Sequence, residues 1–218
     1  MKEFFDEETS LKFVGYSGKD LHSHIFDKEY DFYNNQLNEW SKDKDIKKFI
    51  VANMNVGRYF KLITKVSDST NTQTELHHFF IFDNDQLIGS AVISTNEKPL
   101  YSIISNKSSV FAEISKDKNC MVDILYFVTN PKLRGLGYGT RIIKTIKNYE
   151  KELTNNKNTS GLFAEVRKTN EPSKKAFLKN NFIVIPARHI IEPDKDRYIY
   201  SLYDRLYHGV HAEKFKDK

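Results

Sequence analysis

The stretch VTNPKLRGLGYGTRII, residues 128–143, decides the fold of this chain. It begins where a nearly continuous apolar run ends, CMVDILYFV at 120–128, whose length and composition favour a buried β-strand. The Asn130-Pro131 pair ends that strand. From about Tyr138 to Leu153, apolar residues then recur at helical spacing with basic residues between them. The sequence therefore predicts a strand, a glycine-rich turn and an amphipathic helix in succession.

The turn between these two elements has the composition of an anion site. Three of the chain's nine glycines, Gly135, Gly137 and Gly139, lie within five residues. Glycine lets a ligand approach the main chain closely, and a helix N-terminus offers unpaired N–H groups and partial positive charge. Residues 131–151 also carry six basic side chains against one acidic. A plain connection is the alternative interpretation, but the coincidence of strand, glycines, helix start and charge favours a phosphate ligand.

Two common nucleotide-binding templates do not fit this turn. A Walker loop requires GxxxxGK[ST], which the chain lacks. A Rossmann fingerprint requires a third glycine at position 140, where Thr140 stands. The phosphate ligand is therefore of another kind.

The rest of the chain alternates between strand-like and helix-like segments. Asp83-Asn84-Asp85 separates two strand-like runs and predicts a tight hairpin, and Asn170-Glu171-Pro172 predicts a capped helix start. Residues 96–119 are mixed and fit an inserted strand or loop. The expected strands are 11–16, 77–82, 86–94, 120–128, 161–166, 182–187 and 197–203, and the remaining helices are 28–40 and 43–65. From residue 77 the order is β-β-β-α-β-α-β-β, which indicates an α/β fold with some antiparallel pairs.

The pattern R-x-x-G-x-G, formed by Arg134, Gly137 and Gly139, resembles the acyl-CoA loop of the GNAT N-acetyltransferase superfamily. The family's downstream pattern N-x-x-A/S-x-x-x-Y-x-x-x-G-F is approximated by Asn170, Ser173, Phe177, Asn181 and Phe182. The resemblance covers 77–203 most clearly, and residues 1–76 would supply the N-terminal strand and helices and the acceptor side. It implies one acetyltransferase-like domain over 1–218. The implied fold is a mixed, mostly antiparallel central sheet flanked by helices, with strands four and five splayed around the acyl-CoA.

The resemblance also implies a site for acetyl-CoA as acyl-donor co-substrate. In the family the pyrophosphate lies on the loop and the pantetheine arm pairs with the end of the preceding strand, here Phe127 and Val128. Asn170 and Phe177 would flank that arm. The residues expected at the phosphates are Arg134, Gly135, Leu136, Gly137, Tyr138, Gly139 and Thr140.

Transfer of an acetyl group to a primary amine requires loss of a proton from the amine and a donor for the tetrahedral oxyanion. The backbone N–H of Val128 is the expected donor. Asp123, the acid in the run 120–128, is the first candidate base, and Glu165 is the second; Asp123 could instead face solvent or pair with a basic residue. Phe177 stands where the family commonly has a proton-donating Tyr, so Tyr126, Tyr138 or water would have to serve. A catalytically weak acyl-CoA-binding module is therefore the alternative function.

Composition limits the remaining possibilities. The 218 residues carry a formal net charge of +5, with 39% hydrophobic and 29% charged residues, a globular balance. The single cysteine excludes an internal disulfide, the acidic N-terminus does not resemble a secretory signal, and no apolar run is long enough to span a membrane. We expect a cytoplasmic monomer or homodimer without a metal, whose acceptor is an amine on a small molecule or protein. Nucleic acid is not expected, because aromatic residues are sparse on the basic helices.

Overall fold

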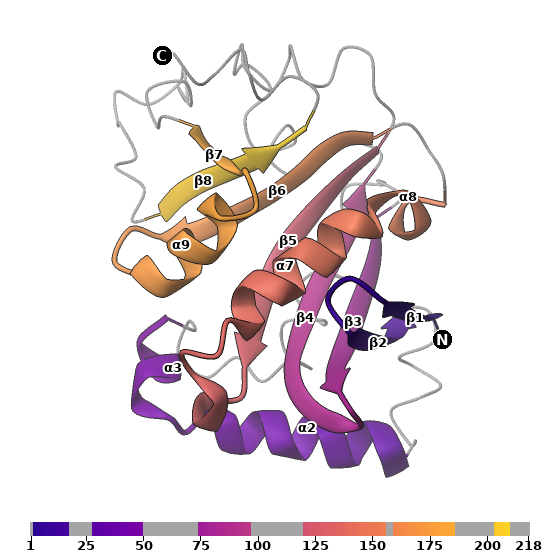
Figure 1. Ribbon diagram of the computed structural model, residues 1–218, viewed down its shortest axis with the longest axis vertical. Coiled ribbons are helices and arrows are strands. Elements are labelled where there is room, and N and C mark those ends of the chain that lie inside the picture. The colour runs from indigo at the N-terminus through magenta and orange to yellow at the C-terminus, as the bar shows by residue number, and fades with distance from the viewer. Residues whose placement is uncertain are drawn as a thin grey trace. The chain divides into compact units, whose positions relative to one another are not determined.

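The computed structural model describes residues 2–17, 28–49, 74–96, 120–155, 159–185 and 203–209 (Figure 1). The chain divides into two compact units. Met1–Ser94 and Leu125–Thr145 form the first unit, and Thr95–Ile124 and Ile146–Lys218 form the second. Strand β5, Cys120–Thr129, contributes its two halves to the two units.

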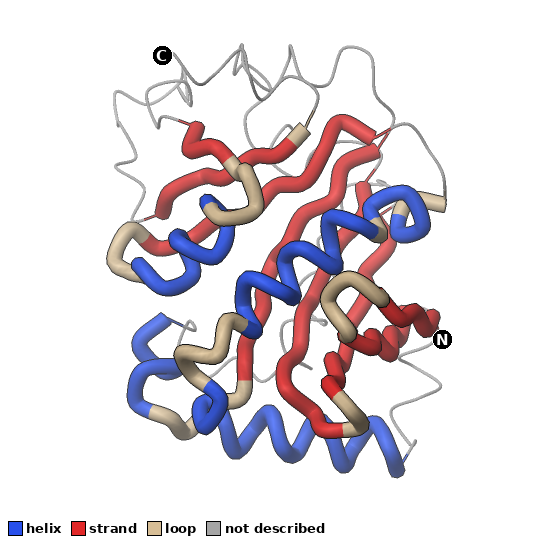
Figure 2. The backbone as a smooth tube through the Cα atoms, viewed as in Figure 1, coloured by secondary structure: helices blue, strands red, loops and turns tan. Residues whose placement is uncertain are grey.

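The first unit is built on strands in the order β1-β2-β3-β4-β5 (Figure 2). These strands are β1 Lys2–Asp6, β2 Leu11–Ser17, β3 Thr74–Asp83 and β4 Gln86–Asn96, followed by the second half of β5. β1 pairs antiparallel with β2, and β2 pairs antiparallel with β3. The β3–β4 hairpin was predicted, and its two turn residues, Asn84 and Asp85, have φ of 45° and 62°. A two-residue hairpin turn requires positive φ at both positions, which Asn and Asp tolerate.

Helices use both faces of these strands because successive strand residues point to opposite sides. On one side, helix α2, Lys28–Trp40, packs its Tyr30 and Leu37 over the strands, and α3, Lys44–Phe49, adds Ile46. The core there, called the α2-side core below, consists of Tyr16, Tyr30, Leu37, Ile46, Leu76, Phe80, Phe82, Leu87, Val92 and Val128.

The neighbouring residues of β3, Phe79 and Ile81, are buried on the other side of these strands. Helix α7, Tyr138–Asn148, packs there with fully buried Ile142 and Ile143. A Cβ built on Gly89 of β4 would lie only 2.8 Å from Ile142 Cδ1. A glycine is therefore required where α7 crosses β4.

The second unit carries strands in the order β5-β6-β8-β7. The first half of β5 pairs parallel with β6, Thr159–Arg167, from Cys120↔Thr159 to Ile124↔Ala164. β8, Tyr203–His208, pairs antiparallel with β6 and with β7, Ile183–Ile185. Helix α9, Glu171–Leu178, begins where the sequence predicts, because the Asn170 side chain accepts a hydrogen bond from the Ser173 N–H at 3.3 Å.

These elements confirm the predicted fold class, a mixed α/β fold with a mostly antiparallel sheet flanked by helices. Some boundaries differ. The helix expected to run to Leu153 ends at Asn148, and a short helix α8, Glu150–Leu153, follows it. β8 begins at Tyr203, the final residue of the strand expected at 197–203, and β1 was not predicted. Residues 50–65, 97–119 and 197–202, to which the sequence assigns elements, lie outside the described residues.

Candidate active site

The start of the glycine-rich loop is fixed by the main chain. The N–H of Asn130, directly after β5, donates to the Ile88 carbonyl oxygen at 2.8 Å. The Asn130 side chain then caps a short 3₁₀ turn, η1, Pro131–Leu133, by accepting from the Lys132 N–H at 3.0 Å. The end of β5 is thereby attached to β4, and the loop leaves from a defined point.

The glycines behave as a ligand cradle requires. Gly135 and Gly137 both have φ of +81°. Residues other than glycine rarely adopt this left-handed conformation. A Cβ built on either one would meet no heavy atom within 4 Å. The space at these two Cβ positions is therefore open in the described part of the chain.

The N–H groups at the loop divide into two sets. The amides of Thr140 and Arg141 donate to the Gly137 carbonyl oxygen at 3.0 and 3.1 Å. The earlier amides lie at or before the first turn of α7, where a helix has no carbonyl of its own to satisfy them. The expected cradle over residues 135–140 is therefore narrowed to the N–H groups of residues 135–139.

The far side of the loop is attached to the β3–β4 hairpin through α7. The Tyr138 hydroxyl donates to Asp83 Oδ2 at 2.9 Å, and Arg141 Nη1 donates to the same oxygen at 3.0 Å. Arg141 Nε also donates to the Thr9 carbonyl oxygen at 2.9 Å. The hydrogen bond to Asp83 raises the pKa of Tyr138. Arg141, one of the six basic residues along 131–151, is therefore a tether between α7 and the strands.

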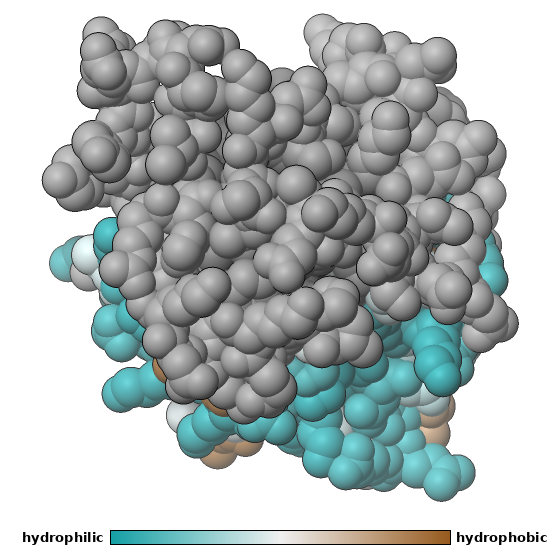
Figure 3. All heavy atoms as spheres, turned by 90° about the horizontal axis from the view of Figure 1, so that it is seen from above, coloured by the Kyte–Doolittle hydropathy of each residue, from teal (hydrophilic) through white to brown (hydrophobic). Residues whose placement is uncertain are grey.

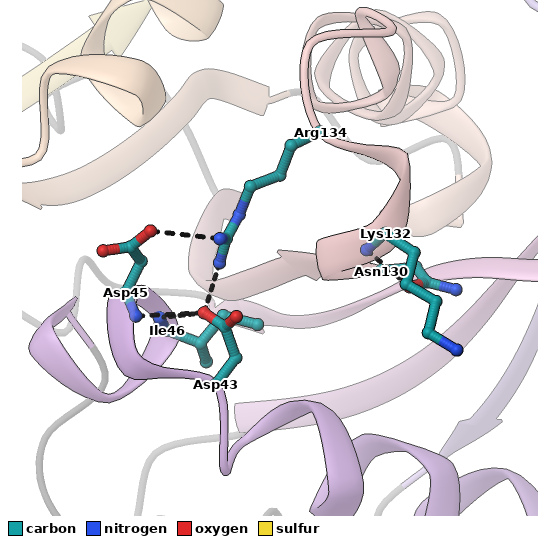
Figure 4. A network of polar contacts seen from close by, with 6 residues as sticks. All are labelled: Asp43, Asp45, Ile46, Asn130, Lys132 and Arg134. Atoms are coloured by element: carbon teal, nitrogen blue, oxygen red, sulfur yellow. Dashed lines mark hydrogen bonds and ion pairs between the residues drawn. The ribbon is translucent and has the colours of Figure 1, made fainter.

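Arg134 is tied to the start of α3 and to the residue before it (Figure 4). Its Nη1 donates to Asp45 Oδ2 at 3.0 Å, and its Nη2 donates to Asp43 Oδ1. Asp43 Oδ1 also accepts from the backbone N–H groups of Asp45 and Ile46, each at 3.0 Å, so it caps the start of α3. The Arg134 hydrogen bond lowers the pKa of Asp43.

The expected donor of the oxyanion site lies at the end of β5. Val128 is buried in the α2-side core, while Phe127 is half-buried. The Val128 carbonyl oxygen would lie only 2.8 Å from a Cβ on Gly89. Any side chain at position 89 of β4 would therefore collide with the main chain of Val128.

Neither tyrosine proposed as a replacement acid is an ordinary exposed phenol. Tyr138 gives its proton to Asp83 in a hydrogen bond. Tyr126 packs against the α2-side core, and burial raises its pKa. Both side chains therefore retain their protons more strongly than a free tyrosine.

The candidate bases Asp123 and Glu165 belong to the second unit. Asp123 is 3% exposed and lies opposite Phe163 in the β5–β6 ladder. The alternative that it faces solvent is therefore wrong. Glu165 is half-buried and lies opposite Arg205 in the β6–β8 ladder. β5 continues five residues past the last pair of its ladder with β6, Ile124↔Ala164.

The two residues expected to flank the CoA arm have structural roles in the second unit. Asn170 caps α9, and Phe177 is 1% exposed with its ring 4.9 Å from that of Phe182. Asn181, which replaces the family's glycine, has φ of 62° and so adopts the left-handed conformation that a glycine would.

One buried polar cluster was not predicted. His78 Nε2 lies 2.8 Å from Ser90 Oγ, and its Nδ1 lies 3.2 Å from the Tyr30 hydroxyl. Burial lowers the pKa of His78 to about 3 and raises that of Tyr30 to about 12. The sequence signal was the His77-His78 pair, but nothing local indicates a partner 48 positions away on α2.

Part of the basic charge of α7 is paired within the first unit. Lys144 pairs with Glu8 at 2.6 Å, so the basic face of α7 is partly neutralised within the first unit. Figure 3 shows mostly hydrophilic residues among the coloured atoms of that view.

Within the described ranges, no group of three or more His, Cys, Asp or Glu side chains is placed to hold a metal ion. No helix there combines the length and apolar character needed to cross a membrane.

Comparison with solved structures shows the same fold in proteins of low sequence identity. An uncharacterized protein from Bacillus halodurans has a TM-score of 0.52 at 13% identity, over 98% of this chain and 92% of that one. The aminoglycoside acetyltransferase AAC(6')-Ib in complex with coenzyme A has a TM-score of 0.52 at 12% identity, over 96% and 100%. Arabidopsis thaliana NAA60 in complex with acetyl-CoA has a TM-score of 0.52 at 13% identity, over 92% and 99%.

A search of curated proteins returns no match. The family model described as "Acetyltransferase (GNAT) family" matches residues 57–182, more than half of the chain. That range includes the loop with Arg134, Gly137 and Gly139 and the downstream helix that Asn170 caps. The chain therefore belongs to the GNAT acetyltransferase family.

Proposed function

We propose that this protein binds acetyl-CoA and transfers its acetyl group to a primary amine by direct attack of the amine on the thioester. The observation that carries the proposal is the open, left-handed loop at Gly135 and Gly137, at the N-terminus of α7, in a chain of the GNAT family. Two solved proteins of the same fold are complexes with coenzyme A or acetyl-CoA, which supports the choice of ligand.

In this proposal the main chain binds the donor. The N–H groups of residues 135–139 and the positive end of α7 bind the diphosphate. The pantetheine arm pairs with the main chain of Phe127 and Val128, and Asn170 and Phe177 flank it. Recognition through the main chain agrees with side chains that are already engaged elsewhere, since Tyr138 and Arg141 both bind Asp83.

The chemical step needs few groups. Asp123 accepts the proton of the attacking amine, with Glu165 as the second candidate. The N–H of Val128 donates to the oxyanion, and no covalent enzyme intermediate forms. The burial of Asp123 supports this role, because a buried carboxylate is shielded from bulk water.

A second candidate function is an acyl-CoA-binding module with little or no turnover. Phe177 favours it, because this buried side chain has no proton to give to the leaving thiolate. The involvement of Tyr138 with Asp83 also favours it, since the phenol already donates its proton.

The donor is tested by thermal denaturation. We expect acetyl-CoA to raise the Tm while NAD and ATP do not. Gly137→Glu should remove that response, because its side chain fills the cradle and repels phosphate. Phe32→Glu on α2, where Phe32 is 60% exposed, adds the same charge away from the loop and should leave the response intact. The absence of any response of the unmodified protein to acyl-CoA would refute the proposed function.

The acceptor is tested with a panel of primary amines and detection of the released thiol. Thiol release that depends on an amine and is lost in Asp123→Asn supports the transferase. Tight binding of acetyl-CoA without release across the panel supports the binding module. We further propose that residues 1–218 form a single cytoplasmic acetyltransferase domain, because the match at 57–182 draws on both compact units and the chain has a single cysteine.

A further inference from the structure

Arg134, a cation of the loop, is already bound to two carboxylates of the protein. The Arg134 guanidinium donates to Asp45 at 3.0 Å and to Asp43, and neither carboxylate belongs to the loop (Figure 4). These three side chains, called the Arg134 clasp below, carry one positive and two negative charges. The Arg134 side chain is 43% exposed, against 27% for Asp43 and 70% for Asp45.

The loop does not depend on the clasp for its shape. Its start is fixed by the Asn130 N–H on Ile88 and by the Asn130 cap of η1. Its end is fixed by the hydrogen bonds of Tyr138 and Arg141 to Asp83. Both attachments lie outside the clasp, so neither of them is broken when the clasp opens.

The turn between α2 and α3 does not depend on it either. Asp43 caps α3 through the N–H groups of Asp45 and Ile46, each at 3.0 Å, and an asparagine side chain can accept the same two hydrogen bonds. The cap therefore does not require the negative charge of Asp43. Within the clasp, that charge serves the ion pair with Arg134.

A guanidinium presents the same pair of donors to a carboxylate and to a phosphate, so the two anions compete for it. We infer that Asp43 and Asp45 are internal competitors for Arg134, and that they weaken the binding of the phosphate-bearing donor at the adjacent glycine cradle. This inference rests on the proposed function. Donor binding then draws Arg134 from the carboxylates to phosphate, and part of the binding free energy is lost in breaking the clasp.

The inference predicts a gain of affinity on removing two charges. Asp43→Asn/Asp45→Asn should lower the Kd for acetyl-CoA about fivefold at low ionic strength, because exposed ion pairs are individually weak. That change corresponds to about 1 kcal/mol. The gain should shrink in 0.5 M salt, which screens the exposed clasp.

The experiment is a double-mutant cycle read by titration calorimetry with acetyl-CoA. The arms are the unmodified protein, Asp43→Asn/Asp45→Asn, Arg134→Gln, and the triple variant. The matched control, Asp31→Asn/Glu39→Gln on α2, removes two charges from the preceding helix without touching Arg134. We expect the gain in the clasp variant alone, and no difference between Arg134→Gln and the triple variant.

Equal or weaker binding by the clasp variant would overturn the inference, and so would an equal gain in the control or a gain that persists without Arg134. Loss of fold in the clasp variant is checked by its Tm, and Asp45→Asn alone, at the more exposed position, then carries the test with a smaller expected gain. If the unmodified protein and every variant fail to bind acetyl-CoA, the proposed function itself fails, which is a different outcome from unchanged affinity.

Discussion

Protonation of His78 should lower the free energy of unfolding of the first unit substantially below neutral pH. The imidazole is fully buried between the Tyr30 hydroxyl and Ser90 Oγ, and burial lowers its pKa to about 3. An unfolded chain returns the imidazole to a pKa of about 6.5. Between these two values the unfolded state binds a proton that the folded state does not, so the free energy of unfolding must fall as the pH falls.

The size of this effect follows from the two pKa values. Each pH unit in the window removes up to about 1.4 kcal/mol, and His78 alone should remove about 2.5 kcal/mol between pH 6 and pH 4. Above pH 7 the contribution is constant, because His78 is neutral in both states. Carboxylates also titrate in this range, so the contribution has to be isolated by comparison.

The assay is urea unfolding of the unmodified protein and His78→Gln at half-unit intervals from pH 7.5 to pH 4. We expect the two stability curves to approach each other by about 2.5 kcal/mol between pH 6 and pH 4, since the variant lacks the titrating group. Curves that stay parallel would refute the buried, neutral histidine. If the variant does not fold, the imidazole proton resonances of the unmodified protein decide the matter, because a His78 signal that titrates near pH 6.5 contradicts the structure.

Three further predictions concern the frame of the site. Gly89→Ala should destabilise the protein by about 1–3 kcal/mol in thermal denaturation, since the new methyl group lies 2.8 Å from both the Val128 carbonyl oxygen and Ile142; an unchanged Tm would contradict that crossing. Gly137→Ala should cost only about 1–2 kcal/mol, because the methyl group meets no atom and only the φ of +81° is strained, while binding of acetyl-CoA falls at least tenfold by calorimetry; intact binding would remove the cradle. Asp83→Asn should cost about 1–3 kcal/mol in urea unfolding and lower the pKa of Tyr138 in an ultraviolet titration, and a phenol that titrates as before would show that Asp83 is not its partner.

The sequence predicted those elements whose signals are local. The Asp83-Asn84-Asp85 turn, the run at 120–128 and the Asn170 cap each lie within a few residues of the structure that they specify. β1 was missed because KEFFD gives only a weak alternation, with Phe4 packed on Phe13 at 4.9 Å and Phe5 55% exposed. Its place is decided by the partner strand, which a short window does not contain.

The charges of the site were harder to assign than its backbone. Counting basic residues along 131–151 treated Arg134, Arg141 and Lys144 as a common positive field. In the structure each has a carboxylate partner far away in the sequence. Arg134 binds Asp43, 91 positions distant, and Arg141 binds Asp83, 58 positions distant. Lys144 binds Glu8. A local count gives the number of charges but not their partners, because ion pairs across a fold depend on topology.

The loop thus uses its side chains and its main chain for different purposes. Arg134, Tyr138 and Arg141 all bind carboxylates of the first unit, whereas Gly135 and Gly137 make no contact that a Cβ would disturb. A substrate bound by these side chains would require their hydrogen bonds to the carboxylates to break. A substrate read by N–H groups needs only the helix start and the left-handed backbone, both of which exist already. Side-chain variants in this loop should therefore change mainly stability, glycine variants mainly binding, and Arg134, whose tether can exchange, is the one side chain expected to change affinity.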